Sequence, residues 1–542
     1  MNPHQPLKED LKDPAPQNQD EKKPEEQIVL KDGHADMSTT HLGMAKQELG
    51  YVVDVDRYIV TVSGLPNAKI NELVTAENGA RGIINALNED LVEVLMLDSE
   101  KIKPKDTFRR TGQQYSVVAG DHLLGRTINP LGVPIDGKER LPTTNVNAAF
   151  DINQIAPDIT TRQFITEQFT TGIGTVDMLV PIAKGQRQLL IGDARAGKTS
   201  FIINTIINQA KVSKDPVICI YAMIGKPVNE VKSLIEVLNA NKAMDHTIVV
   251  ATSSADMATL IYYTPYVAIT LAEYFEKKGK DVLLIWDDLG IHAKYYREIS
   301  LLGNKPPGRQ SYPGDIFYQH ARLVERAGNF NEHAGGGSIT ALPVIETNLD
   351  DLTGFISTNL MAMTDGHIIF DSSLYHRGRK PAIDIFVSVS RVGRQTQGLI
   401  QKLLSDKIKS TLVQAKKLET FSSLGSEVSP ETQRTLNQGK QIETLLNQVP
   451  LTHLPILSQI MLLALVYTDF LASQTPETVE LNKQNLISFV IQMADDIRIQ
   501  QTVNQLKELD QFIAFMTQLS PQLKAIWKGG ENGQSNQTNP RP

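Results

Sequence analysis

Apolar and polar residues follow three successive patterns along the chain, and each pattern predicts a different kind of domain. From Tyr51 onward, short β-rich apolar runs stand between turns, which fits a small β-barrel over residues 49–118. Between residues 119 and 405, strand-like runs alternate with helical segments, a pattern typical of a mainly parallel sheet covered by helices. Residues 406–528 have helical periodicity with prolines between the helices. The chain is therefore expected to be multidomain, with a β-barrel, a central α/β domain and a C-terminal helical bundle.

Apolar runs also mark the individual strands of the first two domains. The runs lie at residues 51–55, 58–62, 82–84 and 91–97 in the barrel, and at 188–191, 217–222, 247–251, 282–286, 338–344, 367–370 and 383–389 in the α/β domain. Parallel sheets of this kind bind ligands at the carboxyl ends of their strands. Functional residues are therefore expected directly after these runs.

The two ends of the chain have a composition that does not favour a packed core. Residues 1–48 hold five prolines, ten acidic and six basic side chains, and residues 529–542 are rich in Gly, Asn, Gln and Pro. Segments with so few apolar side chains bury too little surface to offset the entropy lost on ordering. Both are expected to be disordered, the first as an N-terminal arm and the second as a tail.

Composition limits the functional classes. A chain of 542 residues with 41% hydrophobic and 21% charged residues is typical of a soluble protein with several cores. The apolar stretch from Leu454 to Tyr467 is interrupted by Ser458 and Gln459 and is expected to be a buried helix rather than a membrane span. One cysteine, Cys219, excludes a disulfide framework and favours a reduced, cytoplasmic setting. The net charge of −7 argues against a nucleic-acid partner.

The most specific motif is a phosphate-binding loop. An apolar strand runs into a Gly-x-x-x-x-Gly-Lys-Thr segment and then into a helical pattern. In such a loop the backbone wraps around phosphate oxygens, Lys198 neutralises them, and the hydroxyl of Thr199 is placed to hold Mg²⁺. The expected ligand is ATP or ADP with magnesium, bound by Gly192, Asp193, Ala194, Arg195, Ala196, Gly197, Lys198, Thr199 and Ser200.

A second acidic residue is needed near a nucleotide-bound metal, and it is expected at the end of a neighbouring strand. The run Val282–Trp286 ends in Asp287 and Asp288, and Asp287 is the predicted metal-site residue together with Thr199. The alternative is that the two carboxylates only cap the strand. Cleavage also needs a group that orients the attacking water, so the presence of such a group decides whether the site is catalytic.

Several segments together resemble the alpha subunit of F-type ATP synthase. They are Pro381–Ser390 with the continuation Arg391-Val-Gly393, Leu124–Gly137, Pro306–Asp315 and Ala341–Thr347, and the resemblance covers about residues 50–520. The family's soluble head alternates three alpha with three beta subunits. The resemblance implies that the central domain is RecA-like, and that the chain's partners are a beta-type catalytic subunit and a central-shaft, gamma-like subunit, to which Pro306–Asp315 is similar.

The resemblance also implies roles for single residues. The family's beta subunit has its catalytic glutamate, and its alpha subunit a glutamine, where this chain has Lys226, and a lysine cannot serve as a carboxylate base. Lys226 is left with three alternatives: it contacts a phosphate oxygen, replaces some of the metal's charge, or points to solvent. Arg391 matches the alpha arginine that reaches as a finger into the beta subunit's site, while Tyr375 and Gln448 match residues around the adenine.

The resemblance leaves the output of the complex open between ATP synthesis or hydrolysis coupled to protons and a specialised motor, such as one for surface motility in wall-less bacteria. A peripheral position on the cytoplasmic face of the membrane or in a motor complex is expected. The polar N-terminal arm departs from the family, whose alpha subunits begin with an amphipathic helix.

Two other classes of function compete with the alpha-type interpretation. A Rho-like, self-sufficient hexameric RNA translocase needs basic and aromatic residues on its barrel, whereas residues 51–118 carry eight basic, ten acidic and only four aromatic side chains. A structural assembly subunit with a vestigial P-loop is opposed by the intact Lys198, Thr199 and Asp287.

Overall fold

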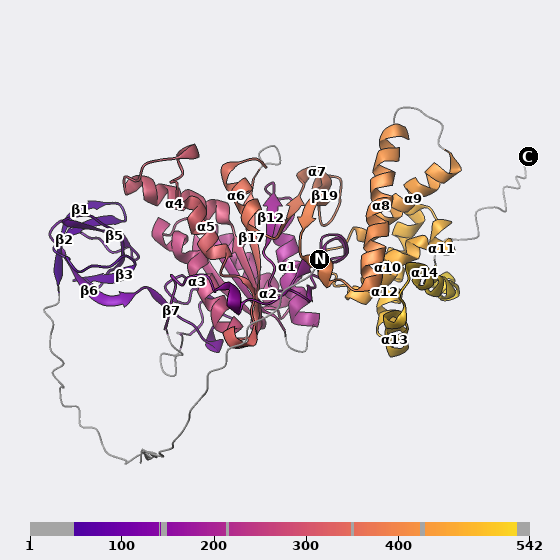
Figure 1. Ribbon diagram of the computed structural model, residues 1–542, viewed down its shortest axis with the longest axis horizontal. Helices are drawn as coiled ribbons and strands as arrows, with labels where there is room; N and C mark the ends of the chain where they lie inside the picture. The colour runs from indigo at the N-terminus through magenta and orange to yellow at the C-terminus, as the bar shows by residue number, and fades with distance from the viewer. Residues whose placement is uncertain are drawn as a thin grey trace, which may run out of the picture. The chain divides into compact units, whose positions relative to one another are not determined.

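The structure is a computed structural model that describes residues 48–139, 141, 149–212, 216–347, 352–422 and 429–527. The expected disordered arm, apart from Glu48, and the expected disordered tail lie outside the described residues. Within the described residues, the expected order of a barrel, an α/β domain and a helical domain is confirmed (Figure 1).

A closed six-stranded barrel opens the described chain, with the strand order β1-β2-β5-β4-β3-β6. Its strands are β1 (Leu49–Asp56), β2 (Ile59–Ser63), β3 (Glu72–Ala76), β4 (Arg81–Leu87), β5 (Leu91–Met96) and β6 (Thr107–Gln114). Strands β3 and β6 were not among the expected runs: β6 is mostly polar, and the apolar residues of β3 are only Leu73, Val74 and Ala76. Glu72 and Arg110 form an ion pair at 3.0 Å between these two strands, and Phe108 is the buried apolar anchor of β6.

The central domain is built on a sheet of the order β19-β18-β12-β17-β15-β13-β14-β8. Its strands are β8 (Thr127–Ile128), β12 (Gln188–Gly192), β13 (Ile218–Lys226), β14 (Thr247–Ser253), β15 (Asp281–Asp287), β17 (Ser338–Glu346), β18 (Gly366–Phe370) and β19 (Ile383–Ser390). All pairs along this order are parallel except β18 with β19, and β16 (Gly328–Asn329) pairs antiparallel with β17. The expected mainly parallel sheet is confirmed. Two further short pairs join β7 (Ser116–Val118) to β9 (Ala149–Asp151) and β10 (Gln168–Phe169) to β11 (Ile182–Ala183).

Alternation along the central strands creates two cores, one on each face of the sheet. In β12, Leu190 packs into the first core, whereas Leu189 and Ile191 pack into the second. The helices of this domain are α1 (Lys198–Val212), α2 (Val228–Ala240), α3 (Ala258–Glu276), α4 (Leu289–Leu302), α5 (Ile316–Val324), α6 (Phe355–Met363) and α7 (Ser372–His376). Helices α1 and α2 contribute to the first core and α3 to α6 to the second, so both faces of the sheet are covered (Figure 1).

The remaining described chain is helical. Its helices are α8 (Leu399–Ser422), α9 (Pro430–Leu446), α10 (Ile456–Ala464), α11 (Asp469–Ala472), α12 (Pro476–Ala494), α13 (Ile497–Gln505), α14 (Leu509–Gln518) and α15 (Ser520–Ile526). The apolar stretch around α10 is buried in the core that also holds α1, as expected for a buried helix. Within the described residues, no helix combines the length and the apolar character that a membrane span requires. Cys219 is a free, buried thiol.

Candidate functional site

The loop after β12 lies tightly against the neighbouring strand β18. Gly192 ends β12 and has a φ of 154°, and a Cβ at this position would stand 2.1 Å from the carbonyl oxygen of Phe370. No other residue type fits so close an approach without moving the backbone. The glycine therefore sets the path by which the chain enters the loop and then helix α1.

Lys198 opens α1 and turns its ammonium group back onto the loop. Its Nζ donates to the carbonyl oxygens of Gly192 and Asp193, at 2.8 and 2.5 Å. Only 7% of the residue is exposed, and this burial lowers the pKa of the lysine, against the attraction of Glu346, Asp287 and Asp288. The loop thus holds a desolvated positive charge at the carboxyl end of the sheet, where an anionic phosphate gains most from it.

The other loop residues differ in exposure. Asp193 is held in place because its Oδ2 accepts a hydrogen bond of 2.5 Å from Ser372. Arg195 is exposed and has a positive φ of 60°. Of the remaining predicted loop residues, Ala196 is buried, Gly197 is half-buried, and Ala194, Thr199 and Ser200 are exposed.

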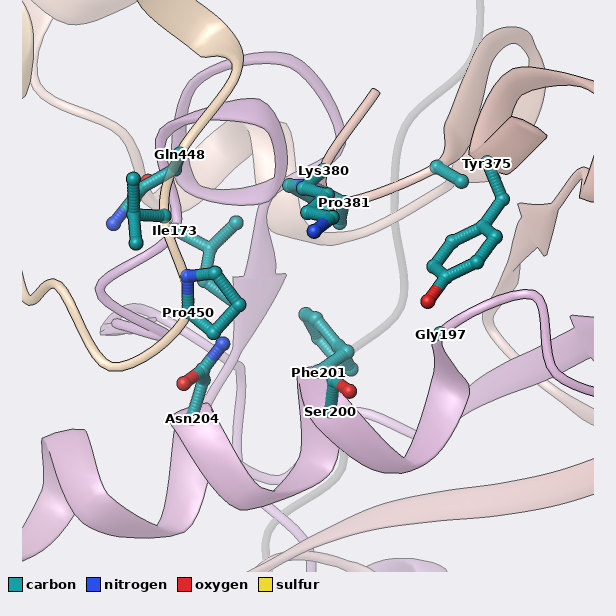
Figure 2. Close-up of a pocket in the computed structure, with 12 residues that line it drawn as sticks. Ile173, Gly197, Ser200, Phe201, Asn204, Tyr375, Lys380, Pro381, Gln448 and Pro450 are labelled. Atoms are coloured by element: carbon teal, nitrogen blue, oxygen red, sulfur yellow. The ribbon is translucent and has the colours of Figure 1, made fainter. Parts of the chain in front are cut away.

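Beside the loop lies an open pocket, shown in Figure 2. Helix α1 contributes Ser200, Phe201 and Asn204 to it, and the remaining lining residues are Ile173, Gly197, Tyr375, Lys380, Pro381, Ala382, Gln448, Val449 and Pro450. Both residues that were predicted for the adenine, Tyr375 and Gln448, therefore line one pocket, next to the P-loop. Tyr375 is 40% exposed, and its ring carbons are about 4 Å from the position of a Cβ on Gly197.

Gln448 forms the pocket wall rather than a free recognition group. Its Oε1 accepts from the backbone N–H of Gly174 at 3.1 Å, while its Nε2 donates to the carbonyl oxygens of Gly172 and Thr452 at 2.8 and 2.5 Å. The side-chain amide is thus engaged on both sides by backbone. A base in this pocket meets mainly apolar and aromatic surface.

Asp287 has partners that differ from those of a metal ligand. Its Oδ2 accepts a hydrogen bond of 2.8 Å from the hydroxyl group of Tyr221, and its Oδ1 lies 2.8 Å from the Nζ of Lys226. The side chain of Lys226 is only 14% exposed, so it does not point to solvent. Burial opposes the charge of Lys226, but the attraction of Asp287 and Asp288 outweighs it, and the pKa of the lysine is raised.

The neighbouring carboxylate, Asp288, has a different role. Its Oδ1 accepts from the backbone N–H of Ile291 at 2.6 Å and caps the N-terminus of α4. The alternative that the acidic pair is structural therefore applies to Asp288. The sheet also corrects one expectation, because β15 is not adjacent to the P-loop strand: β17 lies between β12 and β15.

A magnesium ion bound through Asp287 is not compatible with this arrangement. Both carboxylate oxygens are engaged, one of them by an ammonium group that repels a divalent cation. The residues present therefore do not fit magnesium held by Asp287.

Arg391 lies away from the chain's own P-loop. Strand β18 pairs its last residue, Phe370, with Gly192, whereas its first residue, Gly366, pairs with Ser390 of β19. Arg391 thus follows β19 at the other end of the strands, roughly 15 Å along them from the P-loop. The arginine is exposed, and its Nη1 donates a long hydrogen bond of 3.5 Å to the carbonyl oxygen of Thr364.

Residues 172–390 match the model described as "ATP synthase alpha/beta family, nucleotide-binding domain", and residues 397–517 match "ATP synthase alpha/beta chain, C terminal domain". The chain belongs to the ATP synthase alpha/beta family. The predicted family resemblance is thereby confirmed.

Curated relatives place the chain among the alpha subunits of this family. An ATP synthase subunit alpha from Mesomycoplasma hyopneumoniae strain J is 41% identical over 446 residues, which are 82% of this chain and 86% of the relative. The subunit alpha of Mycoplasma pneumoniae is 42% identical over 74% of this chain and 76% of its own length. That of Lactiplantibacillus plantarum is 40% identical over 83% and 88%.

Sequence reasoning missed two features of the site. Tyr221 lies within an apolar run, so nothing in the pattern separates its hydroxyl group from an ordinary core tyrosine. Ser372 is 179 residues from Asp193 in the chain, and only the pairing of β12 with β18 brings the two together. For the hydroxyl groups of both Tyr221 and Ser372, the order of the strands in the sheet determines the hydrogen-bond partner.

Proposed function

We propose that this chain is a non-catalytic, nucleotide-binding alpha-type subunit of a rotary ATPase head. The main support is the presence of Lys226 at the end of β13. Hydrolysis needs a carboxylate or amide that orients the attacking water near the terminal phosphate. At the end of β13 this chain has an ammonium group instead, paired with Asp287. A cation in this position has no lone pair with which to accept a proton from water. The P-loop therefore binds ATP or ADP without cleaving it.

The adenine and ribose occupy the pocket beside the loop in this proposal. Tyr375 offers a half-exposed ring for stacking, and Ile173, Pro381 and Pro450 supply apolar walls (Figure 2). The phosphates extend to Lys198 and the N-terminus of α1. Because the amide of Gln448 is engaged by backbone, it acts by shaping the pocket.

The active role of the chain is in trans. Arg391 is exposed at the end of the strands that lies away from the P-loop, which supports a role outside the chain's own site. We place it as an arginine finger in the ATP site of an adjacent beta-type subunit, where it stabilises the charge that develops on the transferred phosphoryl group. Magnesium belongs in this account to the partner's catalytic site.

The assembly follows from the alpha-type assignment. Three copies alternate with three beta-type subunits in a hetero-hexamer around a central-shaft, gamma-like subunit, at the cytoplasmic face of a membrane or in a specialised motor. The alpha-type relatives favour this assembly over a Rho-like homohexamer and over a vestigial P-loop protein. No nucleic acid is part of the proposal.

Binding and turnover of the purified full-length chain test the proposal. Calorimetric titration with ATP is expected to give saturable binding, and incubation with γ-labelled ATP is expected to release no labelled phosphate above background. Multiple turnovers by the isolated chain would contradict the non-catalytic assignment. A complete absence of binding would contradict the nucleotide assignment.

A further inference from the structure

The carboxyl end of the sheet gathers an unusual set of charges around the phosphate position. Lys198 follows β12, Lys226 ends β13, Asp287 ends β15 and Glu346 ends β17. Lys226 lies close enough to Lys198 for its charge to act on the pKa of that residue, as do the charges of Glu346, Asp287 and Asp288. Two ammonium groups therefore share the site with three carboxylates.

A divalent cation normally balances the carboxylates and the phosphates at such a site. Here an ammonium group already contacts Asp287, the carboxylate that was expected at the metal site. The Nζ of Lys226 is 2.8 Å from Asp287 Oδ1, and the hydroxyl group of Tyr221 satisfies the other carboxylate oxygen. The three side chains are 14%, 6% and 0% exposed, so the pair is shielded from water, and its charges act strongly on anything bound beside it.

We propose that Lys226 takes the place of the divalent cation, so that the P-loop of this chain binds a nucleoside di- or triphosphate without magnesium. The inference deepens the proposed function and rests on it, because it concerns the same nucleotide site. An ammonium group has three N–H donors, and Asp287 engages one of them. The others serve a phosphate oxygen, so that Lys198, Lys226 and the N-terminus of α1 together neutralise the polyphosphate.

Metal independence is measured by titrating the full-length chain with ATP in two buffers, one with excess Mg²⁺ and one with EDTA. The dissociation constants are expected to agree within about threefold. In Lys226→Gln, which removes the ammonium group, binding in EDTA is expected to be at least about tenfold weaker than in magnesium, a difference of about 1.4 kcal/mol. Lys226→Arg keeps the charge and is the matched control, with metal independence retained.

A second readout does not depend on any variant. The nucleotide complex of the unaltered chain, formed in magnesium and then desalted, is analysed for nucleotide and for metal. The inference expects stoichiometric nucleotide with substoichiometric magnesium. Stoichiometric magnesium, or binding more than about threefold tighter in magnesium than in EDTA, overturns the inference and leaves the proposed nucleotide site intact. Absence of binding in both buffers overturns the proposed function and the inference together.

Discussion

Lys198→Met isolates the charge that the P-loop offers to a nucleotide. The substitution keeps a flexible side chain of similar length but removes the ammonium group and its hydrogen bonds to the carbonyl oxygens of Gly192 and Asp193. In the nucleotide complex that group is expected to donate to phosphate oxygens. The variant therefore removes a charge-assisted interaction without leaving a cavity.

The size of the effect follows from the type of interaction. A hydrogen bond to a charged group contributes about 1.5–3 kcal/mol, which corresponds to a roughly 10- to 150-fold change in the dissociation constant. Without nucleotide, the substitution is expected to raise the stability of the chain or to leave it unchanged. Only 7% of Lys198 is exposed, and burial lowers its pKa. In the nucleotide-free chain, the desolvation of this charge therefore lowers the stability of the fold.

The assay combines calorimetric titration with ADP and thermal unfolding without nucleotide. We expect Lys198→Met to bind ADP at least about tenfold more weakly, with a Tm equal to or above that of the unaltered chain. Lys211→Met is the matched control, because this exposed lysine lies near the other end of α1, and its affinity should be unchanged. Unchanged affinity in Lys198→Met would remove this residue from the site, and a large fall in Tm would show that its role is structural.

Three further predictions concern the finger, the loop and the pH response. Arg391→Ala is expected to slow ATP turnover by the assembled complex about a thousandfold or more, while nucleotide affinity at this chain's own loop stays nearly unchanged. Gly192→Ala places a Cβ 2.1 Å from the carbonyl oxygen of Phe370 and is expected to lower the free energy of unfolding by about 3 kcal/mol or more and to abolish nucleotide binding. Burial lowers the pKa of His320 from 6.5 to about 4. Between these pH values the histidine is protonated in the unfolded chain but neutral in the folded chain. The free energy of unfolding should therefore fall by up to about 3 kcal/mol as the pH drops from 6.5 to 4. Denaturant unfolding at several pH values should show a shallower loss for His320→Leu.

Each of these predictions has a control or a contrary outcome. Arg394→Ala removes an exposed arginine that pairs with Asp406, and turnover should be normal, whereas normal turnover of Arg391→Ala refutes the finger. Gly314→Ala adds a Cβ with nothing within 4 Å, so equal stability of both glycine variants would contradict the close approach of the loop to β18. Equal acid sensitivity of the unaltered chain and His320→Leu would show that other groups dominate the pH response.

The sequence predicted the fold class because a strand that is buried on both faces forms a nearly continuous apolar run, which is easily recognised. All seven expected central strands are present in the sheet. The pattern did not reveal β6, whose residues are mostly polar, or the short strand β3, which begins with the ion-paired Glu72. Strand order is likewise invisible along the chain, and the placement of β17 between β12 and β15 is set by long-range pairing.

For the site, the motif predicted which residues surround the nucleotide, but not what they contact. Tyr375 and Gln448 line one pocket, yet the amide of Gln448 is engaged by backbone from residues more than 270 positions earlier in the chain. Asp287 stands at the end of a strand as expected, but its partners are Tyr221 and Lys226. Such contacts depend on three-dimensional register, which residue types and spacing do not encode.

Native mass spectrometry of the tagged chain, purified with its partners from its own cells, tests whether this chain is an alpha-type subunit of a rotary head. We expect a head of three copies of this chain and three of a beta-type subunit, with one shaft-like subunit and nucleotide retained. The masses of the remaining partners would separate an ATP synthase from a specialised motor. A homohexamer or a monomer without a beta-type partner would contradict the account, because Arg391 would then have no site to complete.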